Sequence, residues 1–138
     1  MNNPMLFALA LAVFATSCGT ASKNCTGTFT GITVTPTTAS ADHTAAAPGN
    51  EATFFAVAQY SYPSGCAIPE PIQVLTAQWS VSDTADVTIT NTPAGQVPGG
   101  VATCLDAVAL PVTVKATASS PTGLPDGIFT STAQLTCK

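Results

Sequence analysis

The chain contains one histidine, His43, which is the first side chain to consider for acid–base or nucleophilic chemistry. Asp42 precedes it, and a hydrolase triad would further require a serine on a sharp turn, as in the G-x-S-x-G pattern. No serine of the chain has that context, and His43 lies in a polar stretch, 36–50, that is typical of a solvated loop. We therefore expect His43 to have no catalytic role and the protein not to be an enzyme.

Asp83 and Asp86, in the segment SDTAD, are the closest pair of carboxylates in the sequence. They could share a Ca²⁺ ion with carbonyl oxygens, but the segment matches neither an EF-hand loop nor a calcium-binding repeat. Aspartate side chains often accept hydrogen bonds from the backbone of a turn. We expect these two residues to cap a turn, and we expect neither a metal ion nor a cofactor.

The remaining reactive side chains are five cysteines, at positions 18, 25, 66, 104 and 137. A structural zinc site would favour the C-x-x-C spacing, which the chain lacks. Disulfides are the expected use in an exported protein, but an odd count leaves one cysteine without a partner.

An unbroken apolar run of about eleven residues, 5–15, stands near the amino terminus. This is the length of a signal-peptide h-region and is far short of the ~20 residues that a membrane-spanning helix needs. The run predicts export, with residues 1–17 as the signal peptide.

The residues that follow, Ala15-Thr16-Ser17-Cys18, resemble the lipobox of bacterial lipoproteins, although Ala15 stands where that family prefers Leu. The resemblance implies that Cys18 is lipidated and becomes the first mature residue. Gly19 after it resembles the pattern that is sent to the outer membrane. The alternative is ordinary secretory cleavage after Ser17, which would leave Cys18 as a free thiol. We favour lipidation because it also accounts for the odd cysteine.

Charged residues make up only 7% of the chain, and the formal net charge is −4. The only bases are Lys23, Lys115 and Lys138. Nucleic-acid binding requires several basic residues on one face, so this composition excludes nucleic acid as an expected partner. It also disfavours electrostatic docking onto anionic lipid.

From Thr28 onward, short segments alternate apolar residues with Thr or Ser, and Gly and Pro punctuate them. A polar connection is expected over 36–50 and a turn-rich one over 91–100, and Gly31 marks a bulge. This pattern predicts an all-β, immunoglobulin-like antiparallel β-sandwich of about seven strands over residues 25–138, joined to Cys18 by the short segment 18–24. The expected strands are 28–35, 51–62, 75–82, 87–90, 101–108, 112–119 and 129–135.

Four segments together resemble a bacterial immunoglobulin-like domain of the group 2 type. They are ITVTP (32–36), TFFA after Gly49 (53–56), QWSVSD leading to Val87 (78–83) and VTVKATA (112–118). The resemblance spans most of 32–136 and implies the immunoglobulin-like fold together with a frequent association with adhesion. The cysteines of the domain depart from the family's usual pattern.

The antiparallel arrangement predicts how the four domain cysteines pair. Cys25, at the start of the first strand, and Cys66, after the second, should lie at one end of the sandwich. Cys104 and Cys137 should lie at the other end. Of the three possible pairings we therefore expect Cys25 with Cys66 and Cys104 with Cys137, neither of them crossing the core between the sheets.

Two aromatic positions are candidates for different roles. Trp79 is expected to be a core residue of its strand rather than a binding platform. Phe55 and Val57 should point outward from the strand 51–62 and, with Tyr62 and Ile68, could form an apolar partner surface. Alternatively, the long connection 36–50 folds over them.

Together these features predict a lipid-anchored, non-catalytic module of the bacterial cell envelope, at the outer membrane, that binds a protein or a polysaccharide or acts in adhesion. The alternative is an accessory or structural subunit of an envelope assembly, docked through the Phe55 face or an edge strand. The membrane is a partner in both cases through the lipid on Cys18.

Overall fold

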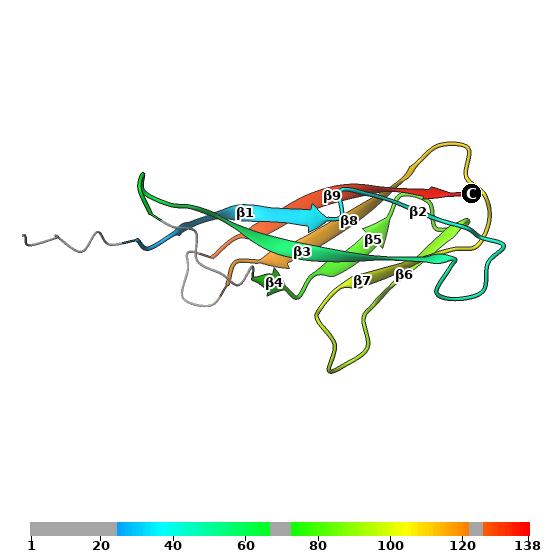
Figure 1. Ribbon diagram of the computed structural model, residues 1–138, viewed down its shortest axis with the longest axis horizontal. Helices are drawn as coiled ribbons and strands as arrows, with labels where there is room; N and C mark the ends of the chain where they lie inside the picture. The colour runs from blue at the N-terminus through cyan, green and yellow to red at the C-terminus, as the bar shows by residue number, and fades with distance from the viewer. Residues whose placement is uncertain (1–24, 67–72, 122–125) are drawn as a thin grey trace, which may run out of the picture.

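The computed structural model describes residues 25–66, 73–121 and 126–138. They form two β-sheets packed face to face, and the prediction of an all-β immunoglobulin-like sandwich is confirmed (Figure 1). Nine strands are present in these ranges, where about seven were expected. No helix of the described residues is long and apolar enough to cross a membrane.

The first sheet has five strands in the order β1-β3-β7-β6, with the short β4 also paired to β3. The second sheet has four strands in the order β2-β9-β8-β5. Without β2 and β4, this is the order of an immunoglobulin constant-type domain, whose sheets are ABED and CFG. The bounds are Thr28–Thr35 (β1), Thr38–Ala41 (β2), Glu51–Ser61 (β3), Val74–Leu75 (β4), Gln78–Val81 (β5), Val87–Asn91 (β6), Gly100–Cys104 (β7), Val112–Ser119 (β8) and Ile128–Cys137 (β9).

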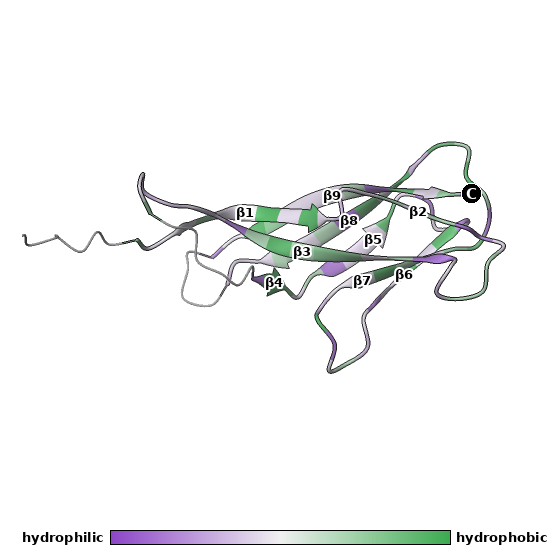
Figure 2. Cartoon of the chain, in the orientation of Figure 1, coloured by the Kyte–Doolittle hydropathy of each residue, from purple (hydrophilic) through white to green (hydrophobic). Residues whose placement is uncertain are grey.

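The core is built by the alternation that the sequence displays. Because successive side chains of a strand point to opposite faces, every second residue enters the space between the sheets. In β8, Val112, Val114, Ala116 and Ala118 are buried, while Lys115 between them is exposed. Figure 2 shows the same alternation of green and pale residues along β1. No polar or charged residue of the described part is buried.

Two of the expected segments cross from one sheet to the other. The connection 36–50 is not a loop throughout, since it contains β2, which pairs in parallel with β9 of the second sheet. The expected strand 75–82 is divided into β4, on the first sheet, and β5, on the second. β2 alternates Thr and Ser with core-facing alanines, but over only four residues, and this pattern is too short to stand out in the polar segment 36–50.

Gly31 forms the predicted bulge. The register between β1 and β3 shifts between Phe29 and Gly31, and Gly31 has a φ of 153°. The extra residue restores the phase in which Ile32 and Val34 face the core.

Trp79 on β5 packs across the sandwich onto β7. A Cβ atom added at Gly100 would lie 2.5 Å from Trp79 Cδ2, so the indole occupies the space that a side chain at position 100 would need. The side chain is half-buried and packs against the core, which confirms the core role predicted for it. Gly99 and Gly100, placed in a turn by the sequence pattern, instead lie buried where the chain enters β7.

Two disulfides join the cysteines in the predicted pairs, Cys25–Cys66 and Cys104–Cys137, with Cα atoms 5.5 and 5.6 Å apart. One expectation was wrong. Cys104 lies on β7 and Cys137 on β9, so this bond does join the two sheets, and its cysteines are only 1% and 2% exposed. Both residues have the inward phase of their strands, which places the disulfide within the core at one end of the sandwich.

Substituting Gly100 tests the contact between the sheets. We expect Gly100→Ala to lower the free energy of unfolding by about 1–3 kcal/mol, because the added methyl group overpacks against the indole. In a Trp79→Leu background the same substitution should cost at least about 1 kcal/mol less. Urea unfolding of the four proteins measures this coupling, and an unchanged cost in both backgrounds would contradict the contact.

The two disulfides should differ in what their removal costs. Their loops of 41 and 33 residues give nearly equal chain-entropy contributions, about 4 kcal/mol each. Cys25 is exposed, whereas Cys104 and Cys137 are buried. Removing the Cys104–Cys137 disulfide therefore also leaves a void. We expect the Cys104→Ala/Cys137→Ala variant to lose about 1 kcal/mol or more beyond the Cys25→Ala/Cys66→Ala variant. Denaturant unfolding compares them, and equal losses would show that the void is filled by relaxation.

Candidate functional site

Phe55 and Val57 lie on the outer face of the five-stranded sheet, as their phase predicted. Each is half-buried and stands in β3 between the neighbouring strands, with Phe55 opposite Thr35 and Val57 opposite both Thr33 and Val74. Two of the three residues opposite them in the neighbouring strands are thus threonines.

Tyr62 does not join this face. Its ring lies 6.2 Å from that of Tyr60, which is on the core side of β3, and it covers Gly27. Residues 60 and 62 have the same phase as Phe54, because side chains of a strand alternate with a period of two. The grouping of Tyr62 with Phe55 was therefore wrong, and the alternation in the sequence already indicates this. Ile68, the fourth predicted member, lies outside the described residues.

A hollow of about 570 Å³ opens beside Phe55. The hairpin that connects β6 to β7 forms one wall, and Val97, just after its turn, is 57% exposed. The segment 36–50, considered above as a cover for Phe55, instead supplies β2 to the other sheet. The hollow is lined by Thr53, Phe55, Thr92, Gly95, Gln96, Val97 and Val101.

The wall of the hollow is held in shape by Thr92. Its hydroxyl donates to the carbonyl of Val97 at 2.9 Å and accepts from the N–H of Gly99 at 3.0 Å. The backbone closes the same hairpin through a bond from the Thr92 N–H to the Gly99 carbonyl. Because the Thr92 hydroxyl is occupied, the Gln96 amide and the Thr53 hydroxyl are the side-chain polar groups left to meet a ligand.

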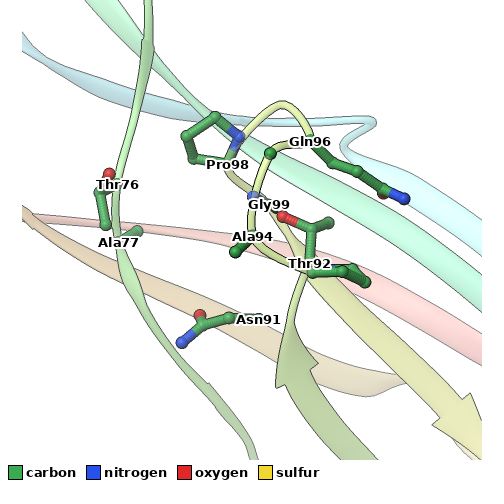
Figure 3. A pocket seen from close by; sticks show the side chains of 10 residues that line it. Thr76, Ala77, Asn91, Thr92, Ala94, Gln96, Pro98 and Gly99 are labelled. Atoms are coloured by element: carbon green, nitrogen blue, oxygen red, sulfur yellow. Dashed lines mark hydrogen bonds between the residues drawn. The ribbon is translucent and has the colours of Figure 1, made fainter.

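The other side of the hairpin has a smaller hollow of about 280 Å³ (Figure 3). Thr76 and Ala77, where the chain crosses between the sheets, form its far side, and the Gln96 side chain extends away from them in this view. Its lining has no aromatic ring. A third hollow, of about 350 Å³, lies beside Trp79. We take the Phe55 hollow as the candidate binding site, since it is larger than either of the others and joins an aromatic side chain to a few polar groups, as is typical of ligand pockets.

His43 lies at the end of the sandwich that carries Cys104–Cys137. Its Nδ1 is 2.5 Å from the carbonyl oxygen of Lys138, and its Nε2 is 3.9 Å from Asp106 Oδ1. Among the described residues, the groups that meet the His43 ring are thus a backbone carbonyl and a carboxylate. The neighbouring Asp42 accepts two hydrogen bonds from Thr44 on its Oδ1. The bond from the Thr44 hydroxyl, and to a smaller extent the bond from its N–H, hold the pKa of Asp42 below its ordinary value.

Asp83 has the turn-capping role predicted for it. Its Oδ1 accepts hydrogen bonds from the N–H groups of Ala85 and Asp86, at 3.0 and 3.3 Å. Across residues 25–66, 73–121 and 126–138, no group of three His, Cys, Asp or Glu side chains is placed to hold a metal ion. Cys18, the predicted lipidation site, precedes the described residues.

Comparison of the chain with protein-family models, curated proteins and solved structures finds no match.

Proposed function

We propose that the protein is a lipid-anchored, non-catalytic module of the bacterial cell envelope, of the group 2 immunoglobulin-like type, which binds a neutral polysaccharide in the hollow beside Phe55. The observation that carries this proposal is the chemistry of that hollow. It combines an aromatic ring with an amide and a hydroxyl, and none of its lining residues is charged.

A sugar ring matches such a surface in two ways. Its faces carry C–H groups, which are attracted to the electron-rich face of an aromatic ring, and its hydroxyls can pair with amide and hydroxyl groups. The volume of about 570 Å³ lies within the usual range for small-molecule sites. An ionic ligand would find no opposite charge in this hollow, so the lining favours a neutral one.

The anchoring part of the proposal is supported by the sequence features described above, the apolar run 5–15 and the lipobox-like residues ending at Cys18. A folded domain beginning at Cys25 leaves only the short segment 19–24 between it and the proposed lipid. A ligand for such a domain would belong to the envelope or to a surface that meets it.

Intact-mass spectrometry of the protein from its membrane fraction tests the anchor. We expect a mature chain that begins at Cys18, carries a diacylglyceryl group with or without an added acyl chain, and holds two disulfides. A chain that begins elsewhere, or an unmodified Cys18, would refute lipidation. The Cys18→Ser variant should be lost from the membrane fraction.

Binding to neutral glycans, presented on an array and as insoluble polysaccharide, tests the site. We expect Phe55→Ala and Gln96→Ala each to weaken binding about tenfold or more, since aromatic anchors dominate most interfaces. Gln96 is exposed, so its loss should not affect folding. Val57→Ala is the matched control, because it lies on the same face but outside the hollow.

Unchanged binding by both Phe55→Ala and Gln96→Ala, with the fold verified by thermal unfolding, would refute the site. Capture of one stoichiometric envelope protein from intact cells, lost in Phe55→Ala and without glycan binding, would instead establish the accessory-subunit function.

A further inference from the structure

The two ends of the sandwich differ in chemistry. We call one the aromatic end, where β1 begins and β3 ends (Thr28 opposite Ser61) and where β8 meets β9 (Ser119 opposite Ile128). This end lies at the left of Figure 1, and Cys25–Cys66 closes it. The other is the acidic end, closed by Cys104–Cys137.

Acidic residues concentrate at the acidic end. Glu51 pairs with Thr103 beside Cys104, the backbone of Asp86 accepts from Leu105, and Asp83 caps the turn before Asp86. Asp42, next to His43 in the chain, and Asp106, whose Oδ1 is 3.9 Å from His43 Nε2, lie in the same region. At the aromatic end, Asp126 is the one acidic residue in the part of the chain that the structure describes.

A chain of four rings occupies the aromatic end and connects the two sheets. Phe129 contacts Phe29 at 4.9 Å between centroids, Phe29 contacts Tyr60 at 5.6 Å, and Tyr60 contacts Tyr62 at 6.2 Å. All four rings remain half-buried rather than buried. Tyr62 lies beyond the last β1–β3 pair, so it is the ring nearest the tip.

The proposed anchor reaches this end of the domain. Seven residue steps separate Cys18 from Cys25, a span of at most about 25 Å. If Cys18 is lipidated, the aromatic end therefore stays within about 25 Å of the bilayer, and this inference rests on that part of the proposed function.

We propose that the aromatic end rests on the phospholipid surface, with Tyr62 in the interfacial region. Tyrosine rings favour the membrane–water interface because they have an apolar body and a polar tip. The tether keeps the local concentration of membrane high, so a weak contact is sufficient. Anionic lipid repels the acidic end, which turns it away from the membrane.

The arrangement determines which surfaces remain available to a ligand. In this orientation the long axis of the sandwich points from the membrane surface outward, with the acidic end farthest from it. The Phe55 hollow, on the side of the first sheet, therefore stays open. The bilayer contact is thus separate from the glycan site and does not compete with it.

Quenching of tryptophan by lipids with nitroxide-labelled chains tests the contact. The mature lipoprotein is reconstituted into vesicles of phosphatidylcholine with a minority of phosphatidylglycerol. Tyr62→Trp places a probe at the aromatic end, and Leu110→Trp, at a residue 78% exposed near the acidic end, is the matched control. Trp79 of the wild type, within the sandwich, supplies the baseline.

We expect the emission added by Tyr62→Trp to fall by about half, and that added by Leu110→Trp to fall by less than about a tenth. Thr28→Trp, at another exposed position of the aromatic end, repeats the measurement should Tyr62→Trp perturb folding. Equal quenching at both ends, or no quenching at the aromatic end of a protein that floats with the vesicles, would overturn the proposal.

A second preparation separates this inference from the anchor. It contains residues 18–138 with Cys18→Ser and an amino-terminal hexahistidine tag, which a nickel-chelating lipid holds on the vesicles. We expect this chain to fold, because all buried core residues lie between Ile32 and Cys137. Quenching confined to the aromatic end here, with no flotation of the natural protein, would refute lipidation and retain the contact. Flotation without quenching would refute the contact and retain the anchor.

Discussion

The structure depends on one constraint, which is that every second residue of each strand must fill the space between two sheets with small side chains. Of the eighteen buried hydrophobic residues, eight are alanines, and Phe54 is the single fully buried aromatic ring in the described part. Each alanine contributes little apolar area, on the order of 0.8 kcal/mol per CH₂ removed from water. The few large contacts between the sheets therefore matter more than in a domain rich in Leu and Ile.

Two of these contacts compensate for the small core. Trp79 reaches across from β5 and covers Gly100, which explains why a glycine lies buried at the start of β7. The Cys104–Cys137 bond joins β7 to β9 covalently at the acidic end. The contact between the rings of Phe29 and Phe129 joins the sheets at the opposite end. The sheets are thus joined by a disulfide at one end and by aromatic packing at the other.

The scarcity of charge shapes what this surface can recognise. With 7% charged residues, the molecule presents mainly hydroxyls, amides and partly covered rings. Such groups pair with neutral polar ligands and with the interfacial layer of a bilayer, and they give little long-range attraction to polyanions. The unequal distribution of the acidic residues along the long axis makes the two ends of this sparsely charged molecule chemically different.

The sequence by itself determined the strands that bury one face and expose the other. β1 and β8 have the predicted bounds, because burial on one face imposes a period of two that the sequence must display. The pairs Cys25–Cys66 and Cys104–Cys137 followed from the same antiparallel order. The outward phase of Phe55 was likewise readable from its place in β3.

Only the tertiary structure decided which sheet each segment joins. β2 and the division between β4 and β5 depend on backbone hydrogen bonds to distant strands. β2 alternates Thr and Ser with Ala over only four residues, and alternation does not say which sheet a strand joins. The Phe55 hollow needs the β6–β7 hairpin, whose lining residues 92–97 follow Phe55 at a distance in the chain, and the shape of this hairpin is fixed by the Thr92 hydroxyl. The separation of an aromatic end from an acidic end has the same origin, because the strand order brings Phe29 to Phe129 at one end and His43, next to Asp42, to Asp106 at the other.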